Sequence, residues 1–286
     1  MAQDRTALGA FLRSRRDRIT PAQAGMTPFP GARRVPGLRK EELAVLAGLS
    51  PDYYSRLEQG RQANISVEVL DGLARALRLD DVERAHLHDL AAPAARSRHR
   101  HRHRPEPEQV ADPGLLRVLS ALDHLPALLL GNRSQVLARN TLLSEVLGHA
   151  MEPGTLFNGW LLTDPGARDR IINWPDFARA AVATMRREAG RRPHDRRLHT
   201  DIQRLRRDPD IARWWDDHGV RDYASMTKRI RHPVAGDLTF GVEMLTGPLD
   251  PDQRLIVYTV EPDSATARVL PMLASWAATA PAPPNS

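Results

Sequence analysis

Apolar residues in the first ninety positions recur three and four residues apart, the spacing that places them on one face of a helix. Leu8, Phe11 and Leu12 predict an amphipathic opening helix. The four prolines and three glycines between Thr20 and Gly37 predict a loop without regular helix. The predicted helices are the opening one, which ends near Ile19, then Arg39–Ala47, a helix capped by Ser50 and ended by Gly60, Ser66–Leu79 and Asp81–Ala91. This segment is predicted to be an all-α domain of five helices.

The chain beyond residue 112 mixes helical and strand periods. The predicted helices are Leu115–Leu125, Thr141–Leu147 and two or three between Trp174 and Trp215, broken at Arg192-Pro193 and Asp208-Pro209. The predicted strands are a hairpin of ALLLG (127–131) with QVLARN (135–140), then 225–231, the alternating run 238–244 and the continuous apolar run RLIVYTVEP (254–262). The pattern predicts an α+β domain with one antiparallel sheet of about five strands, covered by helices on a single face.

The 286-residue chain has a formal net charge of +6, and the basic charge is concentrated at its beginning. Residues 1–104 carry +7, which leaves −1 for the remainder. A basic first third attached to a nearly neutral body predicts that the N-terminal part faces a polyanion. The absence of cysteine excludes a disulfide framework and a thiolate zinc site. No apolar signal segment or membrane-length run is present, so we expect a cytoplasmic protein.

A helix-turn-helix carries the strongest functional signal. Gly48 permits a tight turn between two helices, and Leu49 fills the space between them. Tyr54 and Leu57 of the second helix are expected to point into the core, which leaves its first turn free to enter a major groove. Arg56 is the best candidate for a guanine, because its planar fork fits two acceptors. The predicted DNA-binding residues are Pro51, Asp52, Tyr53 and Arg56 at base edges, with Lys40, Ser50 and Gln59 near the backbone.

The sequence resembles the xenobiotic-response-element type of helix-turn-helix regulator in LRSRR (12–16), RRVPGLRKEELAVLAGLS (33–50), YYSRLEQGR (53–61) and VLDGLARALRLDDVERAHLHDLA (69–91). Its second half is similar to the MmyB-like ligand-binding domain in PALLLGNRSQVLARN (126–140), DPGAR (164–168), WWDDHGV (214–220), TKRIRHPVAGDLTF (227–240) and RLIVYTVEP (254–262). The resemblance implies a PAS-like sensor domain, which binds a fatty acid or similar molecule in some members, on a dimeric transcription factor. The chain departs from the family at Asn173, where Asp usually precedes the tryptophan.

The predicted organisation is a multidomain chain: a helix-turn-helix domain at 1–92, a linker at 93–112, a PAS-like domain at 113–277 and a flexible tail at 278–286. The linker lacks apolar periodicity and carries +5 between residues 93 and 104. Its alternating His99, His101 and His103 could chelate a metal in an extended chain. A solvated polycation that strengthens DNA binding is the favoured interpretation, and neither a metal site nor a cofactor is predicted.

Candidate ligand-binding residues of the second domain fall into two chemical groups. Cations near predicted helix ends could hold a ligand carboxylate, and aromatic residues could line an apolar pocket. The cations are Arg168, His218 and Arg221, and the aromatics are Trp174, Phe177, Trp214 and Trp215. The cations could equally have surface or structural roles, and the aromatic residues could simply pack in the core. Periodicity therefore does not distinguish ligand binding from these ordinary roles.

Two functions other than ligand sensing are consistent with parts of the sequence. Ser225 and Lys228 have the S-x-x-K spacing of a serine nucleophile and its base, as in self-cleaving repressors. That pair needs a helix, whereas this segment has strand character, so no enzyme is predicted. The second domain could instead dock a protein partner without any small molecule. The favoured hypothesis is a homodimeric regulator of double-stranded DNA, tuned by a small apolar or fatty-acid-like ligand.

Overall fold

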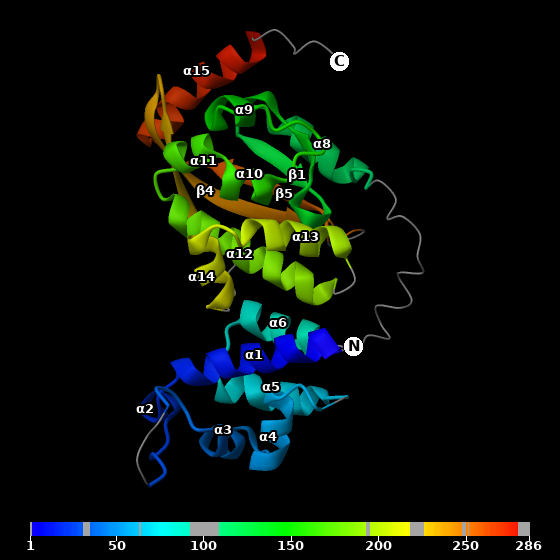
Figure 1. The fold of residues 1–286 in the computed structure, drawn as a ribbon. Helices are drawn as coiled ribbons and strands as arrows, with labels where there is room; N and C mark the ends of the chain where they lie inside the picture. Colours follow the sequence, from blue (N-terminus) through cyan, green and yellow to red (C-terminus); the bar gives the residue numbers. More distant parts are fainter. Residues whose placement is uncertain are drawn as a thin grey trace. The chain divides into compact units, whose positions relative to one another are not determined.

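The computed structural model describes residues 2–30, 35–62, 64–91, 109–192, 195–217, 226–247, 250 and 252–279 (Figure 1). The chain forms two compact units, one of residues 1–104 with 182–222 and the other of residues 105–181 with 223–286. The predicted histidine-rich linker residues His99, His101 and His103 lie outside the described residues. The domain boundaries expected from the sequence stay predictions.

The five helices predicted for the N-terminal segment are present, and its described residues form one more. The helices are α1 (Ala2–Arg18), α2 (Pro21–Ala24), α3 (Lys40–Ala47), α4 (Pro51–Glu58), α5 (Val67–Ala76) and α6 (Asp81–Ala91). The expectation that all of 20–37 is loop was wrong at α2. Thr20 accepts the backbone N–H of Gln23 in a capping box, and Pro21 occupies the first helical position. Gly25, at φ 73°, then ends this single turn.

The core of this segment is built from the apolar faces of all its longer helices. Its most buried side chains include Phe11, Leu12, Leu43, Tyr54, Leu57, Leu73 and Leu87. The backbones of α1 and α4 are so close that a Cβ at Gly9 would lie 2.1 Å from the carbonyl oxygen of Glu58. Only glycine fits at that crossing without moving a helix.

Three helices follow one another between Trp174 and Asp216, as the proline-marked breaks predict. They are α12 (Trp174–Arg191), α13 (Arg196–Leu205) and α14 (Pro209–Asp216). Asp195 caps α13, and Asp208 caps α14 ahead of a proline in its first position. The residues of α12 from Val182 onward, with α13 and α14, belong to the first compact unit.

The described residues of the second unit form a five-stranded antiparallel sheet in the order β2-β1-β5-β4-β3 (Figure 1). The strands are β1 (Ala127–Leu130), β2 (Val136–Arg139), β3 (Met226–His232), β4 (Gly236–Thr246) and β5 (Arg254–Thr259). The helices of this unit, besides the first part of α12, are α8 (Pro113–Ala121), α9 (Thr141–Leu147), α10 (Phe157–Thr163), α11 (Pro165–Arg170) and α15 (Ala265–Thr279), with the 3-10 turn η1 (Asn132–Ser134) between β1 and β2. The predicted α+β class and antiparallel sheet are confirmed.

Helices pack on both faces of this sheet, so the expected single covered face was wrong. Leu129 and Leu255 pack with Leu115 of α8 in one cluster. Alternation along β5 places Tyr258 on the opposite face, together with Lys228, whose ammonium lies over the ring of Phe177 in α12. The central strands β1 and β5 must be apolar on both sides, which explains their continuous apolar runs.

Candidate DNA interface and ligand-domain core

The turn between α3 and α4 forms through local chemistry alone. Gly48 has φ 71°, and its N–H donates to the carbonyls that end α3. The N–H of Leu49 donates to the Ala44 carbonyl at 2.8 Å, and the Leu49 side chain packs against the core. The hydroxyl oxygen of Ser50 accepts the N–H of Tyr53 at 3.1 Å, which starts α4. The chain therefore has the helix-turn-helix geometry that the sequence predicts.

The two faces of α4 differ sharply in burial. Tyr54 and Leu57 are buried, as expected, and the buried face also includes Glu58. Tyr53 is half-buried against the core. The exposed residues of α4 and its end are Pro51, Asp52, Arg56 and Gln59. The start of α4 thus presents the Ser50 hydroxyl and the Asp52 carboxylate to solvent, with the Arg56 guanidinium one turn further along, on the side that would face a major groove.

Arg56 forms an exposed ion pair on the surface of α4. Its guanidinium lies 2.8 Å from the Asp52 carboxylate, and 48% of the Arg56 side chain is exposed. Surface pairs of this kind contribute between about 0 and 1 kcal/mol. Arg56 can therefore leave Asp52 for a base or a phosphate at little energetic cost. Gln59 makes a similar exposed contact, donating from its amide to the Ser55 hydroxyl at 3.2 Å.

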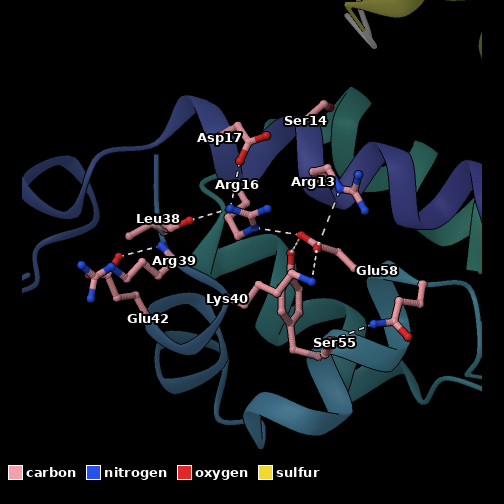
Figure 2. Close-up of polar contacts among 12 residues, drawn as sticks. Arg13, Ser14, Arg16, Asp17, Leu38, Arg39, Lys40, Glu42, Ser55 and Glu58 are labelled. Atoms are coloured by element: carbon pink, nitrogen blue, oxygen red, sulfur yellow. Dashed lines mark hydrogen bonds and ion pairs between the residues drawn. The ribbon is translucent and has the colours of Figure 1, made fainter. Parts of the chain in front are cut away.

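A buried carboxylate fixes the other end of α4 to α1 and α3 (Figure 2). Arg16 Nε donates to Glu58 Oε1 at 2.8 Å, and the Tyr54 hydroxyl donates to the same oxygen at 3.0 Å. Lys40 Nζ lies 3.3 Å from Glu58 Oε2, and Arg13 Nε lies 3.9 Å from it. We call these residues the Glu58 cluster. One carboxylate joins cations from two other helices, so the cluster sets the position of α4.

Electrostatics keep this carboxylate ionised. Burial by itself raises the pKa of Glu58, but the hydrogen bond and charge of Arg16 outweigh it and hold that pKa below its usual range. Burial raises the pKa of Tyr54, and the negative charge of Glu58 adds to the effect. The tyrosine hydroxyl therefore stays protonated as a donor to Glu58. Lys40, predicted to hold a phosphate, reaches the surface with 36% of its side chain exposed, as does Arg13 with 58%.

The backbone at the start of α3 is partly satisfied by the protein itself. Glu42 accepts the N–H of Arg39 at 2.7 Å with one carboxylate oxygen and the N–H of Phe29 at 3.1 Å with the other. A phosphate at this helix start would meet the Lys40 side chain rather than the N–H of Arg39. The phosphate contact of Lys40 stays a prediction.

The predicted ligand-binding residues are only partly brought together. Trp174 and Phe177 are buried on α12, and the Arg168 guanidinium lies 4.1 Å from the Trp174 ring centre. Trp174 Nε1 donates to the Leu161 carbonyl at 2.7 Å, so its polar edge already has a structural use. Trp214 belongs to α14 in the other compact unit. The predicted residues His218 and Arg221 lie outside the described residues.

A buried lysine in the sheet was not among the predicted ligand-binding residues. Lys228 is 1% exposed, and its Nζ donates to the Tyr258 hydroxyl at 2.7 Å. Burial lowers the pKa of Lys228 to about 7 and raises the pKa of Tyr258. The signal was present in the alternation of β3, where Lys228 shares its inward face with Ile230 while Arg229 points outward. In the sequence, Lys228 was considered only as a base for Ser225. Ser225 lies outside the described residues.

Comparison with protein families agrees with both halves of this geometry. A helix-turn-helix domain model matches residues 7–87, and a model of the MmyB-like transcription regulator ligand binding domain matches residues 111–273. The chain belongs to the MmyB-like transcription regulators. No curated protein matches it as a relative. Both families are regulatory rather than enzymatic, so this MmyB-like chain is a DNA-binding transcription regulator with a ligand-binding domain.

The buried lysine lies inside the matched ligand-binding domain of this MmyB-like regulator. Among its described residues, no cluster of histidine and carboxylate side chains could hold a metal ion. No helix within that same part of the chain is both long and apolar enough to cross a bilayer.

Proposed function

We propose that this protein is a sequence-specific, homodimeric regulator that reads its operator with α4 and is tuned by a small apolar ligand. The observation that carries the proposal is the exposed polar first turn of α4, held by the Ser50 cap at one end and the Glu58 cluster at the other. A rigid helix whose side chains are presented to solvent is the element that direct readout requires. Because its target is chromosomal DNA, the regulator acts in the cytoplasm.

In this proposal, residues of α4 and its flanks contact two different parts of the DNA duplex. Pro51, Asp52, Tyr53 and Arg56 meet base edges, and Arg56 reads a guanine through a bidentate contact. Lys40, Ser50 and Gln59 contact the sugar-phosphate backbone and fix the register of the helix on the duplex. Two such helices in a homodimer would meet successive major grooves about 34 Å apart, which predicts a palindromic operator.

The ligand role rests on the PAS-like domain. A fatty-acid-like ligand would bind among the buried aromatic residues Trp174 and Phe177, near Arg168. It changes operator affinity only as far as it binds one dimer arrangement more tightly than the other. Native mass spectrometry of gently purified protein tests this part. A co-purified lipid mass supports sensing, and a co-purified protein in its place supports the docking alternative.

A paired substitution tests DNA reading. A duplex is first enriched from a random-sequence library with the wild-type protein, and its dissociation constant is then measured by fluorescence anisotropy at physiological salt. Arg56→Ala should weaken binding by about 10- to 100-fold, the size of one lost bidentate base contact. Arg84→Ala is the matched control, because Arg84 is 51% exposed and pairs with Asp71 at 2.8 Å elsewhere in the same segment. Equal effects of the two substitutions would overturn the assignment of α4 as the reading helix.

A further inference from the structure

We propose that Lys228 anchors the acidic headgroup of the ligand, so that this domain selects an apolar chain ending in a carboxylate over a neutral lipid. The inference rests on the ligand-sensing role proposed above and names a residue and a ligand class for it. It stands on the placement of one ammonium group among buried aromatic rings on one face of the sheet.

The register of the sheet brings the lysine and the tyrosine together. Lys228 pairs with Phe240 across β3 and β4, and Val242 pairs with Tyr258 across β4 and β5. Phe240 and Val242 are two residues apart in β4, so all four side chains lie on the same face. Tyr258 thus projects from the central strand β5, and Lys228 projects from the edge strand β3, two strands away.

Aromatic rings surround the ammonium group. Lys228 Nζ lies 4.5 Å from the ring centre of Phe177, 4.9 Å from that of Tyr258 and 5.4 Å from that of Phe157. Rings at these distances attract a cation, but they carry no negative charge and accept no strong hydrogen bond. These three rings therefore favour an ammonium group but do not neutralise its positive charge.

Hydrogen-bond donors outnumber acceptors at this place. Lys228 has three N–H donors, and its one hydrogen bond to a described residue goes to the Tyr258 hydroxyl. No carboxylate of the described residues forms an ion pair with it. A carboxylate is the group that would satisfy such a surplus.

The other charged groups on this face have partners of their own. His232 Nε2 lies 3.8 Å from Glu145 Oε1, and its other ring nitrogen accepts the N–H of Ala235 at 3.1 Å. Burial lowers the pKa of His232; the Glu145 carboxylate opposes this shift, and the Arg170 guanidinium adds to it. Glu145 thus faces the histidine, four residues along β3 from Lys228. Among the described residues no carboxylate pairs with the lysine, so an external anion would supply the opposite charge.

The depressed pKa of Lys228 agrees with this assignment. Burial lowers it to about 7, so near neutral pH the amine is divided between its charged and neutral forms. A bound carboxylate would favour the ammonium form and raise that pKa again. Binding of an acid should therefore be accompanied by uptake of a proton, whereas binding of a neutral lipid should not.

The first experiment compares laurate with methyl laurate, which have the same chain and differ in headgroup charge. Affinities for the full-length protein are measured by quenching of tryptophan fluorescence. Wild type should prefer laurate by about tenfold or more, the effect of one charge-assisted hydrogen bond. Lys228→Met should bring the ratio close to one. Arg229→Met, which removes an exposed charge from the adjacent position of the same strand, should keep the wild-type ratio.

The outcomes separate the two proposals. A laurate preference that survives in Lys228→Met overturns the anchoring role and leaves ligand sensing standing. Failure of wild type to bind either lipid overturns the apolar-ligand proposal together with this inference.

A second measurement uses wild type alone and so does not depend on the folding of a variant. Calorimetric titration at about pH 8 in two buffers of different ionisation enthalpy should show uptake of up to about one proton with laurate and none with methyl laurate. Laurate binding without proton uptake would contradict a contact with Lys228.

Discussion

Two buried charged residues, Glu58 in the helix-turn-helix segment and Lys228 in the sheet, have opposite kinds of surroundings. Glu58 accepts hydrogen bonds from Arg16 and Tyr54 and lies near two further cations. Lys228 meets one hydroxyl and three aromatic rings. Both side chains are almost fully removed from solvent, so burial alone does not distinguish them. The difference lies in whether the protein supplies the opposite charge.

That difference indicates different uses. A buried carboxylate with an arginine partner joins elements, because removal of either partner leaves an uncompensated charge. A buried ammonium group without a carboxylate partner costs stability, and proteins retain such groups where function requires them. The Glu58 cluster holds α4 in place, whereas Lys228 fits the binding role proposed above.

Glu58→Gln should have the largest effect, a loss of about 3–5 kcal/mol in the free energy of unfolding of the N-terminal segment at pH 7. The amide cannot balance Arg16, which remains buried. The pKa of Glu58 is lowered in the folded state, so its contribution is present above the ordinary carboxyl pKa and disappears as pH falls through the folded value. Denaturant unfolding at neutral and acid pH measures both effects. Exposed Glu41→Gln is the control, and an equal loss there would contradict the cluster's role.

Lys228→Met should act in the opposite direction and stabilise the ligand-free protein by about 1–4 kcal/mol. Methionine fills a similar volume without a charge to desolvate. Because burial lowers the lysine pKa to about 7, the unfolded chain binds more protons than the folded one between that value and the ordinary lysine pKa. Wild-type stability therefore rises with pH across this window, and the advantage of methionine shrinks. Unfolding at about pH 6.5 and pH 9.5 tests it, and a constant difference would refute the prediction.

Gly9→Ala should cost about 1–3 kcal/mol although alanine normally favours a helix. The new methyl group would meet the Glu58 carbonyl oxygen at 2.1 Å and push α1, with Arg13 and Arg16, away from α4. Gly159→Ala in α10 offers a matched comparison, since its nearest neighbour lies at an ordinary 3.4 Å. Calorimetry should show destabilisation for the first and none for the second. Similar melting temperatures would mean that the α1–α4 crossing is adaptable.

Asn173→Asp should have the smallest effect, a loss of about 1 kcal/mol. The Asn173 amide donates to the Thr227 carbonyl at 2.9 Å and accepts the N–H of Arg229 at 3.0 Å, on either side of Lys228. A carboxylate keeps the second contact but cannot make the first. Hydrogen exchange of the β3 amides should quicken in the variant, and unchanged protection would exclude this anchoring of the strand.

The helix-turn-helix was predictable from sequence because its signals are local. Gly48 at the left-handed position and Ser50 at the cap act within four residues of themselves. The same reasoning located α9, the hairpin of β1 and β2, and the breaks around α13. It failed at α2, where a capped single turn is hidden in a segment rich in proline and glycine. It also failed at the sheet, where α8 covers a second face that strand alternation does not reveal.

The sequence by itself determined the two helices of the helix-turn-helix and the strands of the sheet, where α4 begins, and which of its residues point outward, because backbone propensity, caps and periodicity act over a few neighbouring positions. It did not predict α2, α10, α11 or α15. Only the tertiary structure decided that Glu58 meets Arg16, 42 positions away, and that Lys228 meets Tyr258, 30 positions away. Such partners depend on helix crossings and strand register. These arise from packing of the whole core, and the spacing of residues along the chain does not record them.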